Sequence, residues 1–122
     1  MKISEISSRS GLSIDTLRFY EKIGLIDPPA RDPGGRRVYD AEVLGWIRFL
    51  AQLNATGMKQ SDRLRYAALR RQGEATYSER RQMLEQHREA IREQLKQLTE
   101  TLALMDHKVA LYQQLEQGLE HS

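Results

Sequence analysis

Cationic and aromatic side chains gather in two short segments within the first third of the chain. Arg18, Phe19 and Lys22 lie in the first segment, and Arg36 and Arg37 lie in the second. A guanidinium can bind guanine through two hydrogen bonds or clamp a phosphate, and nearby tyrosine hydroxyls can donate to phosphates. No paired carboxylates, nucleophile–base arrangement or phosphate-binding glycine loop accompanies them. The pattern therefore indicates DNA binding and offers no candidate for an enzyme active site.

Each candidate has an alternative explanation in the stability of the fold. Arg18 could be a solvated arginine, or it could pair with Asp15 three residues earlier. Ser13 could serve only as a helix cap, and the rings of Tyr20 and Tyr39 are expected to pack inside the domain while their hydroxyls face phosphates. The side chains predicted to contact DNA are Ser13, Thr16, Arg18, Phe19, Tyr20, Lys22, Arg36, Arg37 and Tyr39.

A helix-turn-helix is expected to position the first segment. Ser4 is placed to cap a short first helix, and Gly11 is expected to end it because glycine tolerates positive φ. Ser13 then caps a second helix, in which Asp15 favours the helix dipole and after which Gly24 ends the helix. Two short helices joined by a glycine-containing turn are typical of a helix-turn-helix. The second helix would present the cationic side chains.

A small two-stranded wing is expected to position the second segment. All three prolines of the chain lie between residues 28 and 33, where their fixed φ excludes a helix. Asp32-Pro33-Gly34-Gly35 is a strong turn signal. The short flanks Leu25–Ile26 and Arg37–Tyr39 are the predicted strands.

Two more helices complete the predicted DNA-binding domain. Asp40 is placed to cap a helix over about residues 41–55, whose apolar spacing fits a buried face. Trp46 and Phe49 on this helix are assigned to the core rather than to a ligand. A fourth helix is predicted to begin at residue 61 or 62 and to end near residue 72. Its inner face is expected to consist of Leu64, Ala68 and Leu69.

A heptad pattern runs through the last third of the chain. From Ser78 to about Leu119 there is no proline, and good helix formers dominate. All six d positions are apolar or aromatic, and so are three of the five a positions. Such a seam is typical of a coiled coil, and the natural partner is the same helix of a second subunit. The predicted homodimer contacts are Leu84, Ile91, Leu95, Leu98, Leu102, Met105, Val109 and Tyr112.

These elements predict a mainly α-helical chain with two domains. A winged helix-turn-helix is expected over residues 1–72, and a dimerising coiled-coil helix over residues 73–122. Residues 1–72 hold 13 Lys/Arg and 8 Asp/Glu, a net charge of +5, whereas residues 73–122 hold 6 and 9, a net charge of −3. Only the first domain is therefore expected to meet a polyanion.

Composition also limits the location of the protein and the cofactors that it could hold. The chain has no cysteine, no apolar run of 18 residues and no signal-peptide pattern, so we expect a cytoplasmic protein without thiolate metal sites or a membrane partner. His87, His107 and His121 do not converge along the heptads. No metal or other cofactor is expected.

The order of these features resembles the MerR family of bacterial transcriptional regulators. The resemblance rests on the sequences LRFYEKIGLI (Leu17–Ile26) and GRRVYD (Gly35–Asp40), on the Gly57-Met58 junction and on the long terminal helix. It covers essentially the whole chain. It implies a dimer with an antiparallel coiled coil that binds a near-palindromic operator within an over-long promoter spacer. It also implies that the protein bends and untwists this DNA so that RNA polymerase can engage both promoter elements.

Two residues depart from the pattern common in that family. Phe19 and Arg36 stand where many members have tyrosine. The missing hydroxyl at Phe19 removes one phosphate contact and leaves van der Waals or stacking contact. A second arginine beside Arg37 should strengthen phosphate binding without adding base specificity.

Two other functions fit parts of the pattern. Excisionase-like accessory factors share this kind of winged domain, although they usually lack a long dimerising helix. A coiled-coil adaptor with an incidental basic half is the other alternative. The signal sensed is left open, because relatives that sense metals or thiols use cysteines. An effector would lie near the helix junctions, by Tyr66, Tyr77 or Tyr112, unless the protein is regulated by its abundance.

Overall fold

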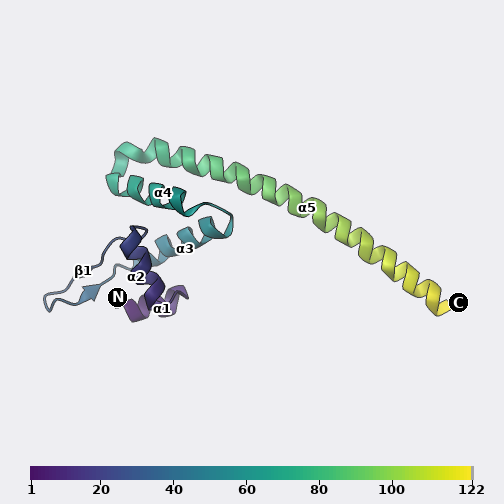
Figure 1. Cartoon of the computed structure of the whole chain (residues 1–122), viewed down its shortest axis with the longest axis horizontal. Coiled ribbons are helices and arrows are strands. Elements are labelled where there is room, and N and C mark those ends of the chain that lie inside the picture. Colours follow the sequence, from purple (N-terminus) through teal and green to yellow (C-terminus); the bar gives the residue numbers. More distant parts are fainter. Residues whose placement is uncertain (122) are drawn as a thin grey trace. The chain divides into compact units, whose positions relative to one another are not determined.

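The computed structural model describes the backbone of residues 1–121 and the side chains of residues 1–120, so the side chain of His121 lies outside the described part. The chain forms two compact units, one over Met1–Met83 and one that begins at Leu84. The elements in chain order (Figure 1) are α1 (Ile3–Ser10), α2 (Ile14–Ile23), β1 (Ala30–Arg31), β2 (Arg37–Val38), α3 (Glu42–Ala55), α4 (Gln60–Gln72), the 3-10 helix η1 (Gly73–Thr76) and α5 (Tyr77–His121). Helices with one small sheet confirm the predicted fold class.

Helices α1 and α2 form the predicted helix-turn-helix. The predicted cap at Ser4 is wrong, because the Lys2 carbonyl already accepts the first backbone hydrogen bonds of α1 and Ser4 lies inside the first turn. Gly11 ends α1 with φ 76°. The cap of α2 is as predicted: the Ser13 hydroxyl accepts a hydrogen bond from the backbone N–H of Thr16 at 3.1 Å.

The wing is present, but its first strand differs from the prediction. Strands β1 and β2 pair antiparallel, with Arg31 opposite Arg37. The turn between them is closed by the Gly35 backbone N–H, which donates to the Asp32 carbonyl at 2.9 Å. The predicted strand Leu25–Ile26 is instead part of the core, with both side chains buried. Burial of these two apolar side chains against the helices outweighs strand pairing, so the hairpin begins after Pro28 and Pro29, and Pro33 lies in its turn.

Helices α3 and α4 pack behind the helix-turn-helix. Helix α3 begins at Glu42 with Ala41 at the N-cap, one residue later than the predicted cap Asp40; the Asp40 carboxylate still accepts the backbone N–H of Glu42 at 3.0 Å. The predicted inner face of α4 is only partly right, since Ala68 is exposed and Leu64 is half-buried. Tyr66 sets the orientation of α4, because its ring stacks on that of Trp46 at 5.9 Å. The buried side chains of α4 are Arg63, Tyr66, Ala67 and Leu69.

Helix α5 is a single helix of 45 residues. At 1.5 Å per residue it is roughly 67 Å long. Its predicted seam is apolar and open in the isolated chain: the Leu98 side chain is 68% exposed, and the other seam residues from Ile91 to Tyr112 are exposed as well. Leu84 is half-buried. None of the described helices is long and apolar enough to cross a membrane.

Candidate nucleic-acid interface

The recognition helix α2 turns its cations outward and its apolar side chains inward. Leu17 is buried, whereas Arg18 and Lys22 are exposed. Among residues 1–120 Arg18 forms no ion pair, so the alternative pairing with Asp15 is absent. Both α2 cations are therefore available to an external anion.

Two aromatic rings extend the same helix surface. Phe19 is 50% exposed. The Tyr20 ring is half-buried and lies 6.3 Å from that of Phe19 between centroids. Van der Waals contact with a DNA backbone would cover Phe19.

The first turn of α2 combines a cap with two hydroxyls. The Ser13 and Thr16 hydroxyl oxygens are 2.9 Å apart, and Ser13 also accepts the Thr16 backbone N–H. Ser13 is exposed and Thr16 is half-buried. The structure thus gives Ser13 a capping role without removing it from the surface.

The wing presents two arginines with different surroundings. Both Arg36 and Arg37 are exposed. Among the described side chains the Arg36 guanidinium has no partner, whereas Arg37 Nη1 lies 3.3 Å from Glu21 Oε2 on α2. The backbone of Arg36 is fixed by the Asp32 carboxylate, which accepts its N–H at 2.8 Å. Of the two neighbouring wing arginines, only Arg37 therefore has a side-chain partner within the described chain.

Glu21 is the residue of this region that the sequence prediction missed. Its side chain is only 11% exposed, and its second oxygen accepts a hydrogen bond from the Tyr39 hydroxyl. Tyr39 itself is 4% exposed, so its hydroxyl faces Glu21. Burial, followed by the hydrogen bond to Glu21, raises the pKa of Tyr39 to about 12. The position of Glu21 beside the cationic residues of α2 was the available signal, but its partners lie 16 and 18 residues further along the chain.

The backbone of Tyr39 is held from the other side by the first residue. The Met1 amino group donates to the Tyr39 carbonyl at 2.6 Å, and the Tyr39 N–H donates to the Met1 carbonyl at 2.7 Å. Tyr39, which directly follows β2, therefore connects the wing with α2 and with Met1, two residues before α1. This placement differs from that of the other eight predicted contacts, because both the ring and the hydroxyl are engaged within the domain.

Arg18 and Lys22 of α2 and Arg37 of the wing line one shallow groove of about 500 Å³, whereas Arg36 lies outside it. The lining of the groove comes from α1, α2, the loop after α2 and β2, namely Ile3, Arg18, Glu21, Lys22, Pro28 and Arg37. Three of these six side chains are cations, and the one acid is paired with Arg37. The groove is therefore a suitable place for a phosphate backbone.

The far end of α2 is fixed by α3 and α4. The Trp46 indole N–H donates to the Leu25 carbonyl at 2.7 Å in a buried hydrogen bond. The Arg71 guanidinium donates to the Gly24 carbonyl and to the Asp27 carboxylate. A cation at a helix C-terminus also favours the helix dipole. The recognition helix is thus held at its end by two other helices.

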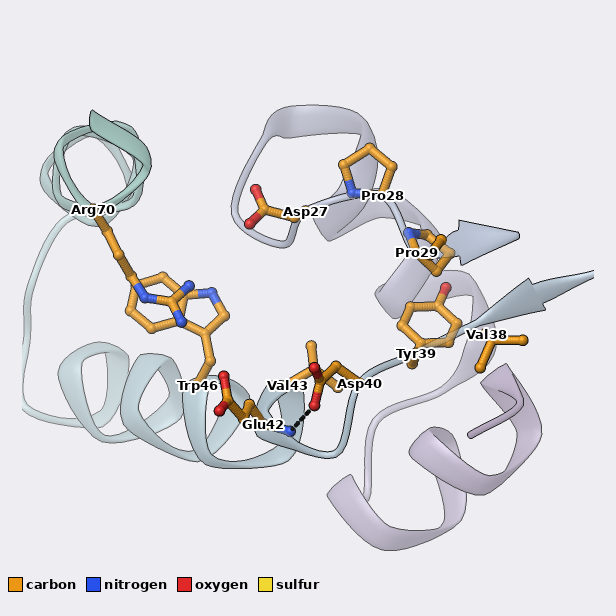
Figure 2. Close-up of a pocket in the computed structure, with 11 residues that line it drawn as sticks. Asp27, Pro28, Pro29, Val38, Tyr39, Asp40, Glu42, Val43, Trp46 and Arg70 are labelled. Carbon is orange, nitrogen blue, oxygen red and sulfur yellow. Dashed lines mark hydrogen bonds between the residues drawn. The ribbon is translucent and has the colours of Figure 1, made fainter. Parts of the chain in front are cut away.

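A second cavity of about 280 Å³ lies beside this attachment (Figure 2). Figure 2 shows Arg70 reaching from α4 across the ring of Trp46, where its guanidinium carbon lies 4.4 Å from the ring centroid. Two of the acids that line the cavity already have partners, Asp27 with Arg71 and Asp40 with the Glu42 backbone. The cavity therefore lies between the wing, α3 and α4, and most of its acids serve the fold. Within the described part of the chain, no group of three acidic or histidine residues could hold a metal.

Sequence comparisons find one family. The model described as MerR family regulatory protein matches residues 2–39. A Haemophilus influenzae protein described as an uncharacterized HTH-type transcriptional regulator is 34% identical, and the match covers 90% of this chain and 82% of that protein. The HTH-type transcriptional regulator AdhR of Bacillus subtilis is 33% identical, and the match covers 75% of this chain but only 65% of AdhR.

Solved structures show the same similarity over nearly the whole chain. The structure of HiNmlR, described as a MerR family regulator lacking the sensor domain and bound to promoter DNA, matches with a TM-score of 0.82 and 33% identity, covering 93% of this chain and 90% of that one. A MerR family protein from Listeria monocytogenes matches with a TM-score of 0.83 and 38% identity, covering 92% and 85%. The predicted family is confirmed: this chain belongs to the MerR family of transcriptional regulators.

Proposed function

We propose that the chain controls transcription by binding a near-palindromic promoter operator as a homodimer. The observation that carries this proposal is the groove in which Arg18 and Lys22 of α2 meet Arg37 of the wing. Cations from two separate elements line this groove, and the one acid in its lining, Glu21, has a side chain that is 11% exposed and pairs with Arg37. Such an arrangement suits the DNA backbone, which carries one charge per phosphate.

The helix and the wing would divide the work of binding. Arg18, with Thr16 and Ser13 at the beginning of α2, is placed to contact base edges or the nearest phosphates, because the helix N-terminus also presents free backbone N–H groups. Arg36 and Arg37 would bind phosphates, and Phe19, Tyr20 and Lys22 would extend the contact along the backbone. Tyr39 would act through Glu21, since its hydroxyl already donates there.

Dimerisation is proposed through α5. Its apolar and tyrosine side chains between Ile91 and Tyr112 repeat at heptad spacing and are exposed in the described chain. Covering one such side chain contributes about 1.5–3 kcal/mol, so a stripe of this length favours association. We assign DNA binding to residues 1–72 and dimerisation to residues 73–122, while the first turns of α5 up to Met83 pack with the DNA-binding unit.

Two recognition helices in one dimer would bind two inverted half-sites. By analogy with the family, we propose that the dimer bends and untwists the DNA between them, which alters the spacing that RNA polymerase meets at the promoter. Deformation of this kind costs on the order of 1–6 kcal/mol, which additional backbone contacts offset. The similarity to HiNmlR, whose structure contains bound promoter DNA, supports the same target class. The site of action would be the bacterial cytoplasm.

The test is a selection of duplexes from a randomised DNA pool with the full-length protein. The enriched duplex is then compared with an unrelated duplex of equal length by fluorescence anisotropy. Arg18→Ala should weaken binding to the enriched duplex by about 1–3 kcal/mol and should affect the unrelated duplex less. Arg48→Ala is the matched control, because Arg48 is an exposed arginine on α3 that lies outside the groove. Equal losses for both variants, or no enrichment at all, would contradict the proposal.

A further inference from the structure

We propose that Glu21 is a positioning residue that fixes the wing to the recognition helix and directs Arg37 toward the DNA backbone. The inference deepens the proposed DNA-binding function and depends on it. Its basis is one carboxylate whose two oxygens hold two different wing residues. Oε2 lies 3.3 Å from Arg37 Nη1, and Oε1 accepts the Tyr39 hydroxyl.

The surroundings of Glu21 make its charge unexpected for a DNA-facing groove. Arg18 and Lys22, its neighbours on α2, are exposed cations, whereas the Glu21 side chain is 11% exposed and lines the same groove. A carboxylate near phosphates repels them, so by charge alone it would oppose DNA binding. A structural role in the interface accounts for its position better than contact with DNA does.

The wing needs such support because it is very small. Strands β1 and β2 have two residues each, and an isolated two-stranded hairpin is at best marginally stable in water. Besides burial of the Tyr39 ring, the described hydrogen bonds and ion pairs that attach β2 and the following Tyr39 to the unit outside the wing are the backbone bonds of Tyr39 to Met1 and the two contacts to Glu21. Glu21 therefore supplies the side-chain link between the wing and the recognition helix.

The link leaves Arg37 able to bind an anion. A guanidinium has five N–H donors, and only one of its nitrogens is engaged with Glu21. An arginine whose orientation is fixed before binding loses less side-chain freedom when a phosphate arrives. Arg36 is the internal comparison, because it has the same charge and neighbouring position but no side-chain partner in the described part of the chain.

The Tyr39 contact keeps the carboxylate in place at physiological pH. With its pKa raised to about 12, the Tyr39 hydroxyl remains protonated and continues to donate. The carboxylate is thus bound on both oxygens, so it can orient Arg37 without rotating freely. Tyr39 supports Glu21, and Glu21 supports Arg37.

Two explanations of Glu21 predict opposite changes in DNA affinity for the same substitution. If the carboxylate merely repels phosphates, Glu21→Gln removes a negative charge and should tighten DNA binding. If it positions Arg37, Glu21→Gln keeps the shape and an acceptor for Tyr39 but loses the ion pair, and binding should weaken about tenfold. The dependence of log K on log salt should also become shallower by about one, because one phosphate contact is lost.

The experiment measures the full-length protein by fluorescence anisotropy on an enriched duplex at several salt concentrations. Glu21→Gln is combined with Arg37→Ala and, in parallel, with Arg36→Ala. The positioning role predicts that losses from Glu21→Gln and Arg37→Ala are far from additive, whereas losses from Glu21→Gln and Arg36→Ala add. Additive losses in both pairs would contradict the role of Glu21.

A second variant that preserves the charge keeps the proposal testable if Glu21→Gln fails to fold. Glu21→Asp shortens the side chain by one methylene, so it breaks the geometry at constant charge. Positioning predicts weaker binding with a shallower salt dependence, and simple repulsion predicts no change. If the wild-type protein binds DNA but both variants bind equally well or more tightly, the positioning role is refuted and DNA binding stands. If the wild-type protein enriches no duplex, the proposed function itself fails.

Discussion

Replacing Trp46 with phenylalanine should destabilise the attachment of the recognition helix to α3 without changing a residue of the proposed DNA-binding groove. The indole N–H makes a buried 2.7 Å hydrogen bond to the Leu25 carbonyl, just beyond the end of α2. Leu25 is 1% exposed, so its carbonyl would have little access to replacement water. A buried acceptor that loses its partner costs about 1–3 kcal/mol.

The smaller ring adds a second loss. Trp46 is stacked on Tyr66 with the rings 16° from parallel, and the Arg70 guanidinium lies over the indole ring. A cation–π contact at a partly exposed site contributes roughly 0.5–1 kcal/mol, and a phenyl ring, a weaker partner for a cation, keeps only part of it. Together these losses predict that Trp46→Phe destabilises the N-terminal unit by about 1–4 kcal/mol.

Hydrogen–deuterium exchange of the full-length protein, resolved by peptide, is the suitable assay, because α5 supplies half of the described α-helical residues and circular dichroism would not separate them from α2 and α3. A loss of about 1–4 kcal/mol corresponds to roughly 5- to 900-fold faster exchange in α2 and α3 when these helices open together. Exchange in α5 beyond Met83 should stay unchanged, since that part forms a separate compact unit.

Phe49→Leu is the matched control. Phe49 belongs to the same ring cluster, with its centroid 6.1 Å from that of Trp46, but its side chain has no hydrogen bond to lose. A hydrophobic exchange of similar volume usually costs less than about 1.5 kcal/mol. If Trp46→Phe accelerates exchange no more than Phe49→Leu, then the bond to Leu25 does not hold α2, and the reasoning is refuted.

Two further predictions concern the wing and the dimer. The Tyr39 pKa is about 12 in the fold and about 10 in an unfolded chain, so the stability that Tyr39 provides is complete below pH 10 and is lost as pH rises toward 12. When the pH is raised from 9 to 11, the free energy of unfolding measured by urea titration should fall by about 1 kcal/mol more in the wild-type protein than in Tyr39→Phe. Equal decreases would show that the Tyr39 hydroxyl is not buried against Glu21. Leu98→Glu places a charge on the exposed seam of α5 and should reduce the light-scattering mass from that of two chains to one, whereas Gln97→Glu, just outside the seam, should not. A Leu98→Glu protein that stays dimeric would place the interface elsewhere.

Local patterns in the sequence predicted the elements because local physics decides them. Ser13 caps α2 and Gly24 ends it with φ 89°. The run without proline after residue 77 forms one helix, and the proline-rich segment forms the wing. Each of these outcomes depends on residues a few positions apart.

Apart from the cap at Ser4, which was misplaced by two residues, the predictions failed where distant residues decide the outcome. The first wing strand was misplaced because Leu25 and Ile26 are drawn into a core built by helices elsewhere in the chain. The buried face of α4 was misassigned because Tyr66 stacks on Trp46, twenty residues earlier. The role of Glu21 was not predicted for the same reason. It depends on Arg37 and Tyr39, and no helical or strand periodicity in the sequence connects these three residues.

We propose that two copies of the chain bind one symmetric operator, each through its own α2 and wing. This can be tested by the mass of the complex between the full-length protein and the duplex enriched from a random pool, measured together with the enriched sequence. Binding as a symmetric dimer should give two chains per duplex and a motif of two inverted half-sites, with both protected by the bound protein. A single half-site bound by one chain, or a motif without inverted symmetry, would contradict it.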